Sequence, residues 1–216
     1  MQPCHDRLAR GKALRGGFEL GKVNSDKMRF YKLLTCLLFI TYILAMLKAV
    51  FPGSFDPPTF GHLNIIERAA LIFDELVVVV ADNRQKKYLF SVEERLEMMK
   101  KIVNSGGNVR ITSWDSLIVD FLKKENIRLL IRGVRGMDDF SYEFELSMMN
   151  KAMHPHIETL FMTTESKYIV LRSSSIKELA SFNGDVSQMV PPLVAEALKR
   201  KFPEISSHKR HKGTEV

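Results

Sequence analysis

The segment AVFPGSFDPPTFGHLNII, residues 49–66, places a Gly-Ser-Phe-Asp-Pro-Pro turn between a short apolar run and a segment with helical periodicity. Gly53 lets the chain turn sharply, and Pro57-Pro58 stiffens the connection. Gly61 puts no side chain at the helix start, where free N–H groups and the positive end of the helix dipole suit an anion. The segment is therefore either a tight connection in which His62 caps the helix, or a phosphate site to which His62 donates a hydrogen bond.

The rest of the chain continues this alternation of strands and helices. Apolar runs predict strands at 48–51, 75–81, 108–112, 127–133 and 157–163, and helical periodicity predicts helices at 62–73, 91–103, 116–126, 139–153, 173–182 and 191–202. The helix at 91–103 opens with a Ser-x-x-Glu capping box. Strands that are apolar on both faces, each followed by a helix, are typical of a parallel sheet covered on both sides. We expect one doubly wound α/β domain with a five-stranded parallel sheet.

Residues suited to phosphate recognition follow four of these strands, and ligands bind beyond the carboxyl ends of such sheets. Besides the turn after the first strand, these residues are Lys86 and Lys87 after the second, Arg132 and Arg135 around Gly133 after the fourth, and Ser173 to Ser175 after the fifth. The lysines and serines also have a structural interpretation, because a lysine pair in a loop is usually solvated and a serine before a helix is commonly an N-cap. The arginines are harder to explain in this way, because unpaired charge at the end of a buried strand is costly.

The candidate residues include no evident nucleophile, paired carboxylate or metal cage. Such a set favours phosphoryl or nucleotidyl transfer that relies on positioning and charge stabilisation rather than covalent catalysis. The chain lacks the G-x-x-x-x-G-K-[ST] motif of P-loop enzymes, and it lacks G-x-G-x-x-G after the first strand. A P-loop enzyme is excluded and a Rossmann dehydrogenase is disfavoured.

The net charge of +7 lies in the two ends of the chain. Residues 1–32 hold 8 Lys/Arg against 3 Asp/Glu and residues 199–216 hold 6 against 2, which leaves −2 for residues 33–198. A nucleic-acid-binding domain usually carries a basic stripe on its folded body, so we expect no nucleic-acid partner. The two cysteines, Cys4 and Cys36, have no zinc-ligand spacing and are compatible with a reducing compartment, here the cytoplasm.

The first 45 residues pose a separate question. About fifteen largely apolar residues lie between Lys32 and Lys48, which is shorter than the ~20 of a membrane-spanning helix and closer to the ~7–15 of a signal-peptide core. No A-x-A cleavage site follows. We interpret 1–45 as upstream translated sequence outside the fold, 46–203 as the domain and 204–216 as a basic tail. The alternative is a membrane anchor at 33–47.

The motifs together resemble one enzyme family. TFGH, residues 59–62, is similar to the [HT]-x-G-H signature of the nucleotidyltransferase superfamily, and RSSSIKE resembles its second signature. FPGSFDPPTFGH, RQKKYLFSVEER, LIRGVRGMDDFSYEFELSMMN and SSSIKELA follow in the order and spacing of the bacterial phosphopantetheine adenylyltransferases, from about Leu47 to Phe202. The resemblance implies AMP transfer from ATP to 4′-phosphopantetheine, giving dephospho-coenzyme A and pyrophosphate.

The resemblance also implies roles for individual residues. His62 would stabilise the transition state, and Ser54, Lys86, Ile118 and Arg132 would bind the pantetheine substrate. The implied ATP site consists of Gly53, Ser54, His62, Gly133, Val134, Arg135, Glu143, Tyr168, Ile169, Val170, Leu171, Arg172, Ser173 and Ser174. Mg²⁺ would accompany ATP without a dedicated metal site in the protein, coenzyme A is a possible feedback ligand, and a homohexamer is the implied assembly.

Three positions depart from the family pattern. Ser54 stands where Thr is usual and keeps the hydroxyl, and Tyr168 replaces a frequent Trp and keeps an aromatic surface. Arg172 occupies a position that is commonly Ser, so it either strengthens contact with the triphosphate or changes a single hydrogen bond. Two rival functions are a small nucleotidyltransferase that acts on nicotinamide mononucleotide or uses CTP with an alcohol phosphate, and a membrane-anchored interaction protein on a degenerate copy of the fold.

Overall fold

A computed structural model describes residues 29–35, 46–83, 85–104 and 106–203 of the 216-residue chain. The chain divides into two compact units, Met1–Ala45 and Met46–Val216. In the first unit, residues 29–35 are helical. Most of the apolar run at 33–47, including Cys36, lies outside the described residues. Within the described ranges, no helix combines the length and the apolar character that crossing a membrane requires.

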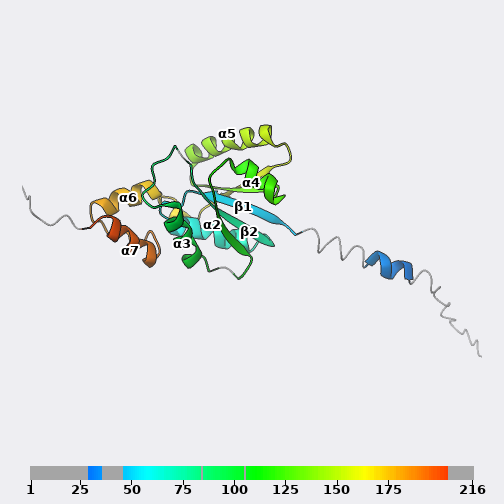
Figure 1. The fold of residues 1–216 in the computed structure, drawn as a ribbon, viewed down its shortest axis with the longest axis horizontal. Coiled ribbons are helices and arrows are strands. Elements are labelled where there is room, and N and C mark those ends of the chain that lie inside the picture. The colour runs from blue at the N-terminus through cyan, green and yellow to red at the C-terminus, as the bar shows by residue number, and fades with distance from the viewer. Residues whose placement is uncertain (1–28, 36–45, 84, 105, 204–216) are drawn as a thin grey trace, which may run out of the picture. The chain divides into compact units, whose positions relative to one another are not determined.

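The second unit is built on a single parallel sheet (Figure 1). Its strand order is β3-β2-β1-β4-β5, so the order reverses between β1 and β4. This is the switch point at which open α/β sheets form a crevice. The strands are β1 (Lys48–Gly53), β2 (Glu75–Ala81), β3 (Val109–Trp114), β4 (Leu129–Val134) and β5 (Glu158–Thr163).

The two neighbours of β1 pair with it over different lengths. β2 follows β1 from the Lys48–Glu75 pair to the Gly53–Val80 pair. β4 pairs with β1 only at Ala49–Leu129 and Val50–Leu130. The ladder between β1 and β4 therefore ends early, and the carboxyl ends of the two strands are free to diverge at the switch point.

Helices cover both faces of the sheet, as the sequence predicted. The helices are α2 (Phe60–Ala70), α3 (Val92–Ile102), α4 (Ile118–Glu125), α5 (Met137–Met153), α6 (Ser173–Ser181) and α7 (Pro192–Lys201), with a short 3₁₀ helix η1 at Ser166–Tyr168. α2 and α3 lie on one side of the sheet, and α4 and α5 lie on the other (Figure 1). Alternate residues of the strands enter the two resulting cores, one around Phe51 and Ile66 and one around Val77 and Leu122.

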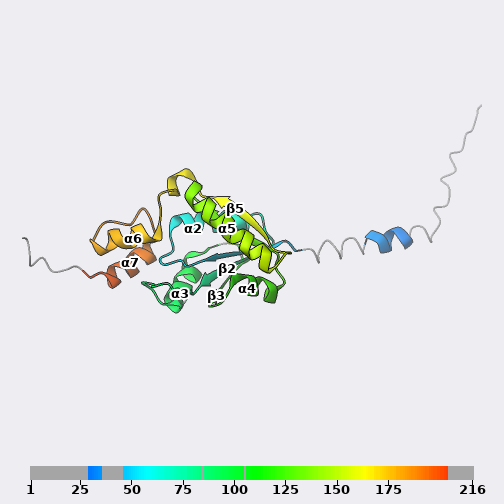
Figure 2. The ribbon, with the colours of Figure 1, turned by 90° about the horizontal axis from the view of Figure 1, so that it is seen from above.

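The C-terminal helices form a third apolar cluster. α6 and α7 lie together at one end of the unit in both views (Figure 2). The cluster buries Ile176 of α6 together with Val194 and Leu198 of α7. These side chains pack against Phe90, which precedes α3, and against Met98, which lies within α3. This cluster anchors the start of α6 beside the carboxyl ends of the strands.

The starts of α3 and α6 agree with the sequence prediction, and of the two interpretations of the serines before α6 the N-cap is excluded. The Ser91 hydroxyl accepts from the Glu94 N–H at 3.2 Å, and the Ser91 N–H donates to the Glu94 carboxylate at 2.8 Å, which confirms the capping box. The N-cap of α6 is Arg172, not a serine. Ser173 is instead the first helical residue, and its hydroxyl donates to the Pro57 carbonyl at 2.9 Å, so it ties α6 to the turn after β1.

Gly133 provides room for α2 to pack on the sheet. A Cβ atom added at Gly133, a residue of β4, would overlap the Ile65 Cδ1 atom. We expect Gly133→Ala to reduce the free energy of unfolding by about 1 kcal/mol, the lower end of the cost of overpacking, because the Ile65 Cδ1 atom is the tip of a flexible side chain and has to move aside. Urea unfolding measures this loss.

Two further variants test the cause of that loss. Gly106→Ala is the matched control, since no atom lies within 4 Å of its added Cβ. In an Ile65→Val background, which removes the Cδ1 atom, the cost of Gly133→Ala should shrink. An unchanged cost in that background would show that Ile65 is not the obstacle.

Candidate active site

The turn after β1 folds inward around Phe55. Phe55 is buried and has φ of 48°, which is uncommon for a residue with a side chain. Its ring lies edge-on to Phe51 and His62, with centroid separations of 5.9 and 5.1 Å. A Cβ on Gly53 would be 2.7 Å from this ring. Gly53, which ends β1, is thus needed for the close approach of Phe55, and the sharp turn expected at Gly53 occurs at Phe55 instead.

His62 occupies the third position of α2 and completes a capping box with Thr59. The Thr59 N–H donates to Nδ1 of His62 at 3.0 Å, and the His62 N–H donates to the Thr59 hydroxyl at 3.4 Å. Because Nδ1 accepts a hydrogen bond, the proton of the neutral ring resides on Nε2. The two interpretations of His62 are therefore compatible: capping through one nitrogen leaves the other as a hydrogen-bond donor.

The environment of His62 keeps the imidazole neutral. Burial, together with the positive charge of Arg135, lowers the pKa of His62 from its ordinary value of 6.5 to about 4. At neutral pH the ring therefore presents a fixed N–H dipole rather than a charge. Such a donor stabilises a developing negative charge without taking part in proton transfer.

The start of α2 offers one backbone donor rather than several. The Phe60 N–H donates to the Met189 carbonyl at 3.1 Å, and the His62 N–H is engaged with Thr59. Gly61 lies between them and lines the cavity described below. Its N–H has no hydrogen-bond partner in the part of the chain that the structure describes, which makes it the backbone donor open to an anion.

Both arginines of the fourth strand region are held by carboxylates of α5. Arg132 lies within β4 rather than after it, and its guanidinium forms a two-pronged pair with Glu143, with Nε at 2.6 Å from one oxygen. Arg135 follows β4, pairs with Asp139 at 2.9 Å and donates to the Leu171 carbonyl at 2.9 Å. These bonds fix the orientation of both guanidinium groups at the edge of the cavity.

Asp56 is a buried carboxylate that connects the turn after β1 with the segment before α3 and with helix α6. It accepts hydrogen bonds from the N–H groups of Leu89 and Phe90 at 3.0 Å, and the Lys177 ammonium of α6 lies 2.7 Å from Oδ2. Asp56 is 4% exposed. Charges this deeply buried require partners, and these three donors supply them. The network holds Lys177 against the cavity wall.

Lys86 and Lys87 differ from the other cations of this region. Neither ammonium group forms an ion pair with any carboxylate among the described residues, whereas Arg132, Arg135 and Lys177 each do. Both lysines are exposed and line the cavity. They are the cations available to an incoming anion without breaking an existing pair.

Most of the sequence-predicted site residues line one cavity of about 530 Å³ at the switch point. It brings together His62, Gly53, Ser54, Lys86, Arg132, Gly133, Arg135, Glu143, Leu171, Ser173 and Ser174. The residues that do not line it are Ile118, Val134, Tyr168, Ile169, Val170 and Arg172. Ile118 begins α4 and packs at the border of the Val77 core. Tyr168 stacks on Phe60 at a centroid distance of 6.4 Å, next to the cavity.

Besides the apolar Phe51, Pro52 and Ile65, the cavity-wall residues that sequence reasoning missed are Phe55, Asp56, Tyr88, Thr164 and Lys177. Apart from its place in the quoted motifs, each looks like an ordinary loop or helix residue. Thr164, which follows β5, carries a buried hydroxyl without a hydrogen-bond partner in the described part of the chain. Its position after the last strand was the available signal.

No metal cage accompanies these groups among the described residues, where no three His, Cys, Asp or Glu side chains cluster as metal ligands do. The two carboxylates of the cavity, Asp56 and Glu143, are each bonded to a cation. The cavity is therefore a predominantly cationic crevice with a neutral imidazole donor. Such a crevice is suited to phosphate groups.

Comparison with known proteins agrees with this chemistry. The model of the cytidylyltransferase-like family matches residues 50–179. The nicotinic acid mononucleotide adenylyltransferase of Plasmodium falciparum, solved with NaAD, superimposes with a TM-score of 0.54 at 18% identity, covering 72% of this chain and 95% of that one. At this identity the likeness establishes the fold alone, a Rossmann-like α/β domain.

Closer relatives define the family. A phosphopantetheine adenylyltransferase of Dictyoglomus thermophilum is 50% identical over 73% of this chain and 96% of its own length. One from Geobacter metallireducens is 47% identical over 71% of this chain and 94% of its own. The chain belongs to the phosphopantetheine adenylyltransferase family.

The lowered pKa of His62 makes stability depend on pH. Unfolding exposes an imidazole that protonates near 6.5, whereas the folded protein resists protonation until about pH 4. The unfolded state thus binds more protons in this window. We expect His62 to cost stability as the pH falls from 6.5 toward 4, by up to about 1.4 kcal/mol per pH unit. Urea unfolding across this range measures the slope.

His62→Gln is the reference for this titration, because it retains polar capping atoms but does not titrate. The difference in slope between wild type and variant isolates the histidine from the carboxylates. Identical slopes would mean that His62 titrates normally in the folded protein.

Proposed function

We propose that this chain transfers the adenylyl group of ATP to 4′-phosphopantetheine, producing dephospho-coenzyme A and pyrophosphate. The observation that carries the proposal is a cavity at the β1–β4 switch point that gathers His62, Lys86, Lys87 and the start of α6. The choice of substrates rests on relatives about 50% identical that are named for this reaction. Such a cavity provides positioning and charge stabilisation, the two requirements of nucleotidyl transfer.

In the proposed reaction a phosphate oxygen of 4′-phosphopantetheine attacks the α-phosphorus of ATP in line. A new P–O bond forms as the bond between the α-phosphorus and the bridging oxygen breaks, and pyrophosphate carries away the electron pair. Nε2–H of His62 would donate to an α-phosphate oxygen as its charge grows. The neutral ring suits this task, since it needs neither to gain nor to lose a proton.

The cations of the cavity divide between the two substrates in this proposal. Lys86 and Arg132 would hold the phosphate of pantetheine, while Arg135 and the first turn of α6, with Ser173 and Ser174, would face ATP. Ser54 lies between the two sets. Helix α6 contributes N–H groups that have no intrahelical acceptor, as at every helix start. Ile118 would line the path of the pantetheine arm.

Mg²⁺ would enter with ATP in this proposal. Mg²⁺ keeps several waters and binds phosphates with one or two carboxylates, so a protein cage is unnecessary. Glu143 and Asp56 are the carboxylates that line the cavity. When bound, the ion supplies neutralisation of phosphate charge.

The substrates are tested by pyrophosphate release from the full chain. Turnover is expected with ATP and 4′-phosphopantetheine, with dephospho-coenzyme A identified by mass spectrometry. Nicotinamide mononucleotide with ATP, and CTP with an alcohol phosphate, should give none. Turnover with either of these pairs, and none with 4′-phosphopantetheine, would assign the cavity to a rival nucleotidyltransferase.

The role of His62 predicts a kinetic signature. His62→Ala should lower kcat by about 10²–10³-fold, the usual effect of removing one transition-state donor, while ATP affinity falls much less. His62→Gln retains a donor and should lose less. Equal losses of turnover and of ATP binding would show that His62 acts only on the ground state.

We also propose a homohexamer with coenzyme A as a feedback ligand, the arrangement implied by the family resemblance. Helix α5 supports self-association, because it has no buried residue and leaves Met137, Tyr142, Phe144, Met148, Met149 and Met153 exposed. An apolar helix face of this kind commonly marks an interface. Light scattering of the purified chain measures the assembly, and a monomer at working concentration would contradict it.

A further inference from the structure

Arg95 is a fully buried arginine that does not line the cavity. It lies on the first turn of α3, is 0% exposed and is among the largest buried side chains. Burying a guanidinium group is costly unless its donors find acceptors and its charge finds a partner. Its place in the core therefore calls for a role that a simple apolar side chain could not fill.

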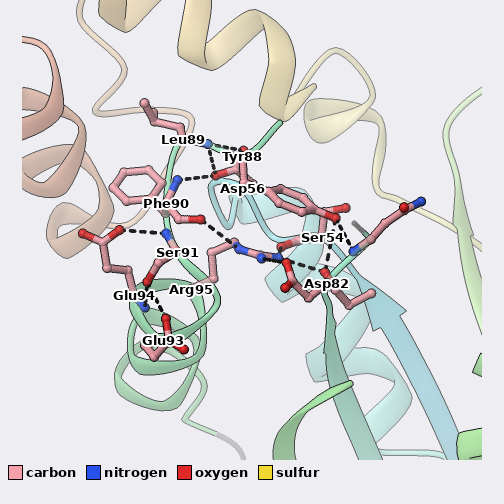
Figure 3. A network of polar contacts seen from close by, with 12 residues as sticks. Ser54, Asp56, Asp82, Tyr88, Leu89, Phe90, Ser91, Glu93, Glu94 and Arg95 are labelled. Atoms are coloured by element: carbon pink, nitrogen blue, oxygen red, sulfur yellow. Dashed lines mark hydrogen bonds and ion pairs between the residues drawn. The ribbon is translucent and has the colours of Figure 1, made fainter. Parts of the chain in front are cut away.

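The guanidinium reaches acceptors in three separate segments (Figure 3). Nη1 donates to the carbonyls of Ser54 and Ala81, each at 2.9 Å. Nη2 donates to the Asp82 carboxylate at 2.7 Å, and Nε donates to the Phe90 carbonyl at 3.2 Å. One side chain thus joins the turn after β1, the end of β2 and the segment before α3.

These contacts enclose the loop that carries Lys86 and Lys87. Ala81 and Asp82 stand at its beginning, and Phe90 stands at its end. Within the loop, the Tyr88 ring lies under the guanidinium at 3.9 Å, and the Tyr88 hydroxyl accepts from the Asn83 N–H at 2.9 Å. Asp56, in the turn after β1, accepts hydrogen bonds from the N–H groups of Leu89 and Phe90 at the end of the same loop. The two ends of the lysine loop are therefore fixed relative to Ser54.

We propose that Arg95 is a positioning residue that sets the distance between Ser54 and the lysine loop, and thereby the site of the acceptor phosphate. This inference rests on the proposed function for the identity of that phosphate. Arg95 makes no contact with substrate itself. It acts through the backbone carbonyls of Ser54 and Phe90 and through the Tyr88 ring.

The geometry explains why this position holds arginine rather than lysine. A planar guanidinium has five N–H donors in a rigid fork, and it stacks on aromatic rings. An ammonium group at the end of a flexible stem can satisfy only part of this set. We expect Arg95→Lys to retain part of the positioning effect and Arg95→Met, which retains volume without donors, to lose it.

The experiment measures steady-state kinetics with each substrate varied in turn. For Arg95→Met, kcat/KM for 4′-phosphopantetheine should fall by about 10²-fold, since displacement of a bound group by about 1 Å has that effect. The KM for this substrate should rise more than the KM for ATP, and Arg95→Lys should lie between wild type and Arg95→Met.

The control is a core variant of similar stability. Ile157→Ala creates a cavity beside the amino end of β5, away from the lysine loop, and its Tm can be compared with that of Arg95→Met. If Ile157→Ala at a matched Tm changes the kcat/KM for each substrate to the same extent as Arg95→Met does, Arg95 serves stability alone and the proposal fails.

Amide hydrogen exchange gives a second test, which requires neither catalytic activity nor a fully folded Arg95→Met variant. Asp82→Asn removes the charge partner of Arg95 from a side chain that is 36% exposed. In this variant and in Arg95→Lys, amide hydrogen exchange at Leu89 and Phe90 should quicken relative to wild type, while exchange in β5 should not. Unchanged exchange at both amides overturns the proposal. Absence of wild-type turnover with 4′-phosphopantetheine would instead overturn the proposed function and leave the loop measurement intact.

Discussion

The short ladder between β1 and β4 determines where the sheet stops pairing and the cavity begins. β1 is paired with β2 along its whole length but with β4 at only two positions near its start. Beyond Val50, the backbone N–H and C=O groups of β1 that face β4 need hydrogen-bond partners outside the ladder. Arg132 of β4 supplies one such partner: its guanidinium, which is bound to Glu143, donates to the Pro52 carbonyl at 3.4 Å. Pro52 itself has no N–H to satisfy. The cavity therefore begins where this ladder ends, and Pro52, Gly53, Arg132 and Gly133 line it.

The sequence was sufficient to predict the fold because its signals were local and consistent. β-branched runs such as ELVVVVA and helices with capping boxes specify their own conformations, and each of the predicted helices and strands is present. Right-handed crossovers then leave few ways to arrange a parallel sheet. The strand order could not be obtained from these signals, because it depends on which strands pair with each other and not on the conformation that each segment prefers by itself.

The candidate site was predictable where function requires an unusual residue at a strand end. His62, Lys86 and Arg135 satisfy that criterion, and the cavity contains all three. Asp56, Lys177 and Arg95 were missed because their roles depend on partners far away in the sequence, such as the Asp56–Lys177 ion pair. The bond between the Ser173 hydroxyl and the Pro57 carbonyl could not be predicted for the same reason, since the two residues lie far apart in the chain. Ile118 and Arg172 lie outside the cavity wall, and their roles stay predictions.

The separate apolar cluster under α6 and α7 has a consequence for cooperativity. The cavity takes one wall from the sheet and its loops, and the other from α6, whose apolar side packs in a cluster distinct from the two sheet cores. Segments with their own packing can open with their own free energy, below that of global unfolding. A ligand that contacts both walls binds only the state in which the two are assembled. Ligand binding is therefore linked to docking of α6 and α7 on the rest of the domain. By mass action, a bound ligand stabilises the docked state relative to any state in which these helices are undocked.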